Sequence, residues 1–123
     1  MPADIKNSSS LELARFAATL AEEKLATDIV VLDLRPVTDF ADFMVICTGV
    51  VDVHVRAIAD HVDDELHKRG VHARHIEGSQ SGRWILIDYF DVVVNVFLPE
   101  ARTYYALERL WGDAPLLNAE QPE

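Results

Sequence analysis

The sequence contains a single cysteine, Cys47, among 123 residues, so no disulfide can form within the chain. Cys47 ends the apolar run 43–47, which favours a small buried side chain over a reactive thiol. Long hydrophobic runs are also missing: none approaches the ~20 residues of a membrane-spanning helix. The first ten residues lack the apolar stretch of a secretory signal. We therefore expect a protein of the reducing cytoplasm that makes no membrane contact.

Basic residues are scarce. The chain has 11 Lys and Arg against 21 Asp and Glu, a formal net charge of −10. Such a chain repels phosphate backbones, and its Lys and Arg form no stripe, so we expect little or no direct RNA contact. A basic protein partner matches this charge better, although solubility alone would also account for it.

Motifs for catalysis and for cofactors are absent too. The five histidines lack HExxH spacing, no CxxC accompanies them, and neither a GxSxG elbow nor a glycine-rich phosphate loop occurs. Asp33, Asp39 and Asp42 lie around the first two expected strands, where turn and capping roles suit Asp39 and Asp42 better than catalysis. We expect no enzyme, no metal and no cofactor.

Half of the residues are hydrophobic, enough to build the core of one domain. One domain is expected over residues 10–113, between loose tails at 1–9 and 114–123. Asp60, Asp63 and Asp64 should face solvent on the second helix. The element order indicates an α/β fold, a mixed sheet of about five strands with helices packed on it. Periodicity predicts helices over 10–25, 53–69 and 100–111, capped at Ser9 or Ser10 and at Asp52, and strands over 28–35, 43–48, 71–76, 83–88 and 92–97.

The last two strands form a hairpin with two possible registers. A two-residue turn at Phe90 and Asp91 puts Asp88 opposite Val93, but requires a positive φ at Phe90. A three-residue turn avoids that strain and shifts every pair by one residue. The first register places aromatic and polar groups on one face, which suits a binding surface; alternatively, Trp84 packs under the last helix and Asp88 caps the hairpin. The residues of that mixed face are Trp84, Asp88, Asn95 and Phe97.

Nine short stretches, in this order, resemble one known family. They are DIVVLD (28–33), TDF (38–40), FMVI (43–46), TG (48–49), VRAIAD (55–60), EG (77–78), WILID (84–88), VVNVF (93–97) and YALERLW (105–111). Together they resemble the ribosomal silencing factors, also called Iojap-like or YbeB-like proteins, over residues 11–113. The chain departs from the family pattern at Asn95, where His is usual, at Phe90, where Gly is common, and at the apolar pair Val50 and Val51.

The resemblance implies a nucleotidyltransferase-like fold without the catalytic pattern. It also implies binding to the large ribosomal subunit through its protein fourteen, which blocks joining of the small subunit and represses translation; homodimers occur in the family. The alternatives are a nucleotide-using enzyme of the same fold and a dimeric adaptor unrelated to the ribosome. The predicted partner-binding residues are Glu77, Trp84, Asp88, Asn95, Phe97, Arg102 and Tyr105.

Overall fold

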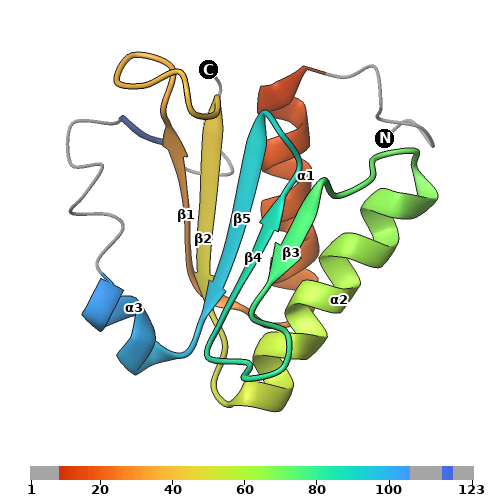
Figure 1. Ribbon diagram of the computed structural model, residues 1–123, viewed down its shortest axis with the longest axis vertical. Helices are drawn as coiled ribbons and strands as arrows, with labels where there is room; N and C mark the ends of the chain where they lie inside the picture. The colour runs from red at the N-terminus through yellow and green to blue at the C-terminus, as the bar shows by residue number, and fades with distance from the viewer. Residues whose placement is uncertain (1–8, 106–114, 118–123) are drawn as a thin grey trace.

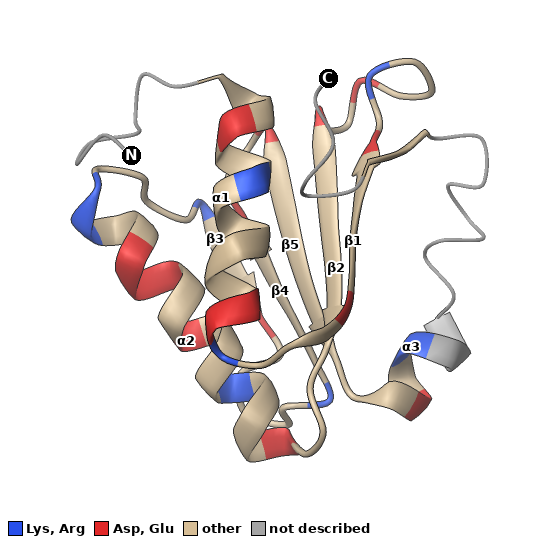
Figure 2. Ribbon diagram, turned by 180° about the vertical axis from the view of Figure 1, so that it is seen from behind, with Lys and Arg blue, Asp and Glu red and all other residues tan. Residues whose placement is uncertain are grey.

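A six-stranded mixed sheet forms the centre of the fold, and two long helices cover one of its faces (Figure 1). The computed structural model describes residues 9–105 and 115–117. Seen from behind, α1 and α2 lie in front of the strands (Figure 2), and of the described helices the short helix α3 lies at one end of the opposite face. The elements are α1 (Ser10–Glu23), β1 (Thr27–Asp33), β2 (Phe43–Thr48), α2 (Asp52–Lys68), β3 (His75–Glu77), β4 (Trp84–Asp88), β5 (Val92–Phe97), α3 (Pro99–Tyr105) and β6 (Leu116–Leu117).

The strand order is β3-β4-β5-β2-β1-β6, and the predicted α/β fold with a mixed sheet is confirmed. All strand pairs are antiparallel except β2 with β5, which are parallel. In the chain, α2 and the β3–β4 hairpin lie between these two strands and connect them. The sheet has one strand more than expected, because β6 pairs with β1 at Val31 and Leu32. Within the described ranges, no helix is long and apolar enough to cross a lipid bilayer.

Helix α1 begins with a capping box. The Ser9 hydroxyl accepts a hydrogen bond from the Glu12 N–H at 3.1 Å, and the Glu12 carboxylate accepts the Ser9 N–H at 3.2 Å. Of the two predicted caps, Ser9 is therefore the right one. The helix ends at Glu23, two residues before the predicted end, because Leu25 has a φ of 65° and cannot continue it.

Helix α2 differs from its prediction at both its cap and its acidic face. The N-cap is Val51, not Asp52; Asp52 lies in the first turn and pairs with Arg56. Asp60 and Asp64 are exposed as expected, but the expectation was wrong for Asp63. Asp63 is half-buried and accepts a hydrogen bond from the Tyr89 hydroxyl at 2.7 Å.

The predicted strand 71–76 is shorter and later than expected, since only His75–Glu77 pairs with β4. The Val71 N–H donates instead to the Leu66 carbonyl at 2.9 Å and closes the end of α2. The residues that follow a helix bond to its free carbonyl groups, and these residues are then not available to pair with a strand. The strand therefore begins further along the chain.

The β4–β5 hairpin has the two-residue turn at Phe90 and Asp91. Asp88 pairs with Val93, and the Tyr89 N–H donates to the Val92 carbonyl at 2.9 Å. Phe90 adopts a φ of 80°, so the expected strain is real but does not shift the register. The Asp88 carboxylate accepts the Phe90 N–H at 2.8 Å, which helps to hold this turn.

Two apolar clusters lie on the two faces of the sheet. The larger one packs α1 and α2 against inward-facing residues of β1, β2, β4 and β5 and contains Cys47. Cys47 is fully buried, as predicted, and burial raises its pKa to about 12. The smaller cluster lies on the opposite face and includes Phe97 and, from α3, Ala101. The predicted helix 100–111 begins at Pro99; residues 106–111 and the predicted boundary at 113 lie outside the described residues.

Candidate functional site

The face of the sheet away from α1 and α2 carries most of the predicted partner-binding residues. Its side chains form rows across the strands: Trp84 lies opposite Phe97, Leu86 opposite Asn95, and Asp88 opposite Val93. The β3 edge extends two of these rows, since Glu77 pairs with Leu86 and His75 with Asp88. We call this surface the open face; it consists of His75, Glu77, Trp84, Leu86, Asp88, Val93, Asn95, Phe97, Met44 and Ile46.

Trp84 has the largest side chain of the open face, and two neighbours orient it. Its indole stacks on Phe97 with ring centroids 5.0 Å apart and an interplanar angle of 22°. Its Nε1–H donates a hydrogen bond to Asn95 Oδ1 at 2.9 Å. Phe97 is fully buried, whereas Trp84 remains half-buried. Trp84 therefore packs on the second core cluster and still presents part of its ring at the surface, in an orientation that Asn95 and Phe97 define.

The Asn95 side chain has one polar atom without a partner. Asn95 is fully buried in β5, and its Nδ2 group finds no hydrogen-bond acceptor among the residues that the structure describes. Leaving a buried donor unsatisfied costs about 1–3 kcal/mol. An Asn side chain whose oxygen is bonded while its buried NH2 group finds no acceptor in the described chain lowers the stability of the fold.

Asp88 has partners inside the chain. Its carboxylate pairs with Arg74 at 2.8 Å and accepts the Phe90 N–H, so it caps the hairpin as the alternative interpretation predicted. Burial by itself would raise the pKa of Asp88, but the hydrogen bonds from Arg74 and Phe90 hold it below its ordinary value. Asp88 is therefore an ionised, mostly buried carboxylate at the upper end of the open face.

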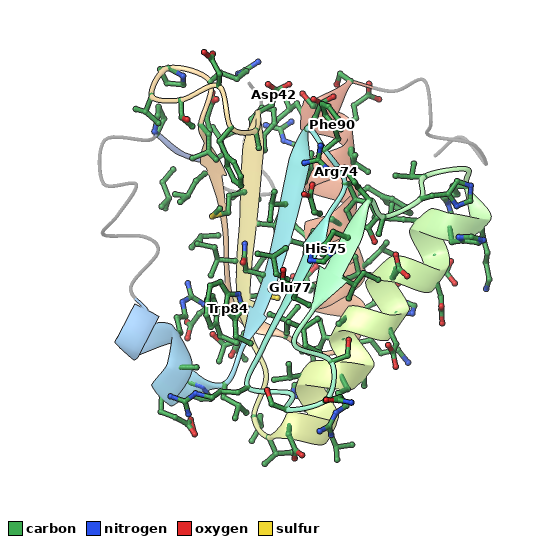
Figure 3. All side chains as sticks on the ribbon, viewed as in Figure 1. Asp42, Arg74, His75, Glu77, Trp84 and Phe90 are labelled. Carbon is green, nitrogen blue, oxygen red and sulfur yellow. The ribbon has the colours of Figure 1, made fainter. Side chains whose placement is uncertain are left out.

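Glu77 is exposed on the edge strand β3. Its carboxylate contacts the His75 imidazole, and it lines a shallow pocket together with Gly78, Trp84 and Leu86. Figure 3 shows Trp84, Glu77, His75 and Arg74 following one another along this side of the sheet, up to Phe90. Strand alternation was sufficient to place His75 on this face, because residues two apart in a strand, such as His75 and Glu77, point to the same side. Nothing in the sequence pattern indicated Arg74, whose guanidinium also lies over the Phe90 ring at 4.3 Å.

Arg102 and Tyr105 lie on α3, at the end of the open face near Phe97. Arg102 Nη1 donates to the Asp28 carbonyl at 2.6 Å and to the Thr48 hydroxyl at 2.8 Å, so this side chain ties α3 to the ends of β1 and β2. Tyr105 is the last residue of α3, and its side chain lies outside the part of the chain that the structure describes.

The carboxylates near β1 and β2 have structural partners. The Arg35 guanidinium bonds to Asp33 and holds the pKa of Asp33 below its ordinary value. Asp42 accepts a hydrogen bond from the Ser10 hydroxyl at 2.8 Å, which joins the start of α1 to β2. Across residues 9–105 and 115–117, no three His, Cys, Asp or Glu side chains gather closely enough to hold a metal ion.

Comparison with known proteins identifies the family. The family model described as "Ribosomal silencing factor during starvation" matches residues 7–123. The ribosomal silencing factor RsfS of Bacillus subtilis is 41% identical over 108 residues, which cover 88% of this chain and 92% of that protein. The chloroplastic protein Iojap of Arabidopsis thaliana is 32% identical over 122 residues, 94% of this chain and 50% of that longer protein.

Solved structures agree with this result. A crystal structure of a Chromobacterium violaceum protein superposes with a TM-score of 0.80 at 36% identity and covers 91% of this chain and 88% of that one. The matched family description is that of a silencing factor and not of a catalyst. The chain belongs to the ribosomal silencing factor family, as the order of its motifs predicted, and is a regulator rather than an enzyme.

Proposed function

We propose that this protein represses translation by binding the large ribosomal subunit where the small subunit docks, so that the two subunits cannot join. The mechanism is steric exclusion, and no covalent bond forms or breaks. The observation that supports this proposal best is the oriented, half-buried indole of Trp84 on a sheet face that neither α1 nor α2 covers. Aromatic anchors of this kind dominate the binding energy of many protein interfaces.

We propose large-subunit protein fourteen as the direct partner, with little or no RNA contact, in the cytoplasm. A chain with a net charge of −10 is attracted to a basic protein and repelled by a phosphate backbone. The exposed Glu77 carboxylate can accept a charge-assisted hydrogen bond from a partner's Arg or Lys. Asp88 can do the same only by sharing or exchanging its bond with Arg74.

The predicted residues divide into two groups. Trp84 and Glu77 have surface to offer to a partner, whereas Asn95 is fully buried and acts by orienting the indole. Phe97 acts through Trp84, because it is buried beneath the indole. Arg102 acts by holding α3 in place, while Tyr105 is proposed as a contact from its position on α3 alone.

Co-sedimentation tests the proposal. The wild-type protein should pellet with purified large subunits and should reduce their joining with added small subunits. Glu77→Gln should weaken pelleting without changing thermal stability, because the carboxylate is exposed. Trp84→Ala should weaken it by about thirtyfold, the loss of roughly 2 kcal/mol that an anchor residue carries. Asp60→Asn, which removes one exposed charge from α2, is the matched control and should pellet like the wild type.

Two results would contradict the proposal. One is wild-type protein that stays in the supernatant with large subunits at micromolar concentration. The other is a pair of open-face variants that melt and pellet like the wild type. The homodimer implied by the family resemblance is also a proposal, and equilibrium sedimentation of the protein alone measures it.

A further inference from the structure

One end of the molecule exposes four aliphatic side chains. Leu25 is 77% exposed, Val50 69%, Val51 53% and Val53 67%. Leu25 lies in the connection after α1, Val50 and Val51 lie in the connection before α2, and Val53 lies in the first turn of α2. His54 joins these connections: its Nδ1 accepts the Val50 N–H at 2.8 Å, and its Nε2 lies 2.7 Å from the Lys24 carbonyl. We call Leu25, Val50, Val51 and Val53 the aliphatic end patch.

Two members of this patch occupy positions that suit other residue types. Leu25 follows the C-cap of α1 with a φ of 65°, in the left-handed region where Gly or Asn is favoured. Val51 is the N-cap of α2, where Ser, Thr, Asp or Asn would bond to the free N–H groups, and no side-chain cap bond is present. Neither residue is buried in exchange. Such departures from local preference without a folding benefit are expected at functional surfaces.

The surroundings of the patch are acidic. Figure 2 shows Asp and Glu at the end of α1, at the start of β1 and at the start of α2. The two neighbouring cations are Lys24, which is exposed, and Arg56, which is already engaged, since it bonds to Asp52 and to the Ser79 and Gln80 carbonyls. The exposed acids next to the patch in the chain are Glu22, Glu23, Asp28 and Asp52; of these, Glu23 contacts His61 and Asp52 pairs with Arg56.

This charge decides among the possible occupants. A second copy of the chain would bring two acidic rims together, and nucleic acid or an anionic lipid surface would be repelled in the same way. A segment with apolar side chains flanked by Lys or Arg satisfies both the aliphatic centre and the acidic rim. We propose that the aliphatic end patch binds an amphipathic, basic segment of a second protein. The proposal does not depend on ribosome binding by the open face.

The test exploits the poor fit of these residues to their own backbone. In the variant Leu25→Asn/Val51→Ser/Val53→Thr, each new residue suits its position at least as well as the old one: Asn in the left-handed region, Ser at the N-cap, and Thr with the shape of Val. The thermal midpoint should therefore be equal to or higher than that of the wild type. Binding should fall, because the apolar surface is gone.

The probe is a fluorescent helical peptide with leucines on one face and lysines on the other. A second peptide with glutamates in place of the lysines reports on charge. The wild type should bind the lysine peptide, and the triple variant should bind it about tenfold or more weakly. The glutamate peptide should not bind. Val37→Thr removes an exposed valine from the β1–β2 turn and is the matched control, so it should bind like the wild type.

The proposal fails if the wild type does not bind the lysine peptide or if the triple variant binds it as tightly as the wild type. It also fails if Val37→Thr weakens binding as much as the triple variant does. It also fails if the wild type self-associates in a sedimentation experiment and the triple variant does not, because a second copy is then the occupant. Should the triple variant melt below the wild type, the single change Val53→Thr, at an exposed position in the first turn of α2, must still weaken binding.

Discussion

Replacing Asn95 by Leu should make the protein more stable, although it removes a buried hydrogen bond. Asn95 is fully buried, with Oδ1 bonded to the Trp84 indole and Nδ2 without an acceptor among the described residues. Losing the Oδ1 bond costs about 1 kcal/mol, whereas removing the unsatisfied donor recovers about 1–3 kcal/mol. Leu has nearly the same volume, and we expect water to take the place of Oδ1 at the indole N–H, because the Trp84 side chain is only half-buried. We expect a gain of about 1 kcal/mol, or roughly 3–5 °C in Tm.

Calorimetry and urea unfolding measure the change, and Trp84→Phe provides the control. Phe keeps an aromatic ring on Phe97 but leaves Asn95 Oδ1 buried without a donor, so Trp84→Phe alone should cost about 1–3 kcal/mol. In the Asn95→Leu background the same change should cost less, because no buried acceptor remains to be left unpaired. The difference between the two costs is the coupling energy of the pair.

Ribosome binding should move in the opposite direction. Without Oδ1 the indole loses the hydrogen bond that fixes its orientation on Phe97. Asn95→Leu should therefore weaken pelleting with large subunits by about tenfold while it raises Tm. If Asn95→Leu lowers Tm by several degrees, the Nδ2 group has a partner in the folded chain and the reasoning above is wrong.

Three further predictions concern polar groups elsewhere in the fold. Asp63→Ala should lower the free energy of unfolding by about 1–3 kcal/mol in urea, because the buried Tyr89 hydroxyl loses its acceptor; an effect below half a kcal/mol would refute this. The pKa of Asp88 is lower in the folded chain than its unfolded value of about 3.9, so its contribution to stability is present above that pH and is lost as the pH falls through the folded pKa. Asp88→Asn should thus lower Tm at pH 7 and lose this effect once the pH falls below the folded pKa, and a difference that persists in acid would contradict the ionic role given to Arg74. Cys47, buried and with its pKa raised to about 12, should react with iodoacetamide only in denaturant, and rapid labelling of the native protein would disprove its burial.

Interactions that span a few residues could be predicted from the sequence. The Ser9 cap and the bounds of β2 and β5 agree with the structure. Each depends on a side-chain type or an apolar run that lies within one helical turn or one strand. The grouping of Trp84 with Asp88 likewise follows from strand alternation alone.

The resemblance of nine ordered stretches also determined the family, which comparison with known proteins confirmed. No single stretch was diagnostic, but order and spacing over most of the chain are a property of the sequence itself. The departures from that pattern, at Asn95, Phe90 and Val50, likewise needed no structure to be noticed. The sequence did not show what these three residues do in the folded protein.

Tertiary structure decided which local preference prevailed. Phe90 disfavours the two-residue turn, yet the turn forms, because Asp88 bonds to the Phe90 N–H and this register puts Ile85 and Ile87 on the same helix-covered face as Val96 and Val94. Asp63 looked like one of three solvent carboxylates until the hairpin brought Tyr89 against α2. In both cases the pairing or packing of neighbouring elements outweighs the preference of a single residue.

The same holds for the candidate site. The sequence predicted Arg102 as a partner contact, but the fold brings it to the Asp28 carbonyl, 74 residues away, and to the Thr48 hydroxyl, 54 residues away. The fold likewise engages Asp88 with Arg74 and leaves the Nδ2 of Asn95 buried and unpaired within the described chain. Residue type and alternation determine which side chains share a face. Which polar atoms on that face are already satisfied depends on the register of neighbouring strands and the packing of α3, and these only the tertiary structure decided.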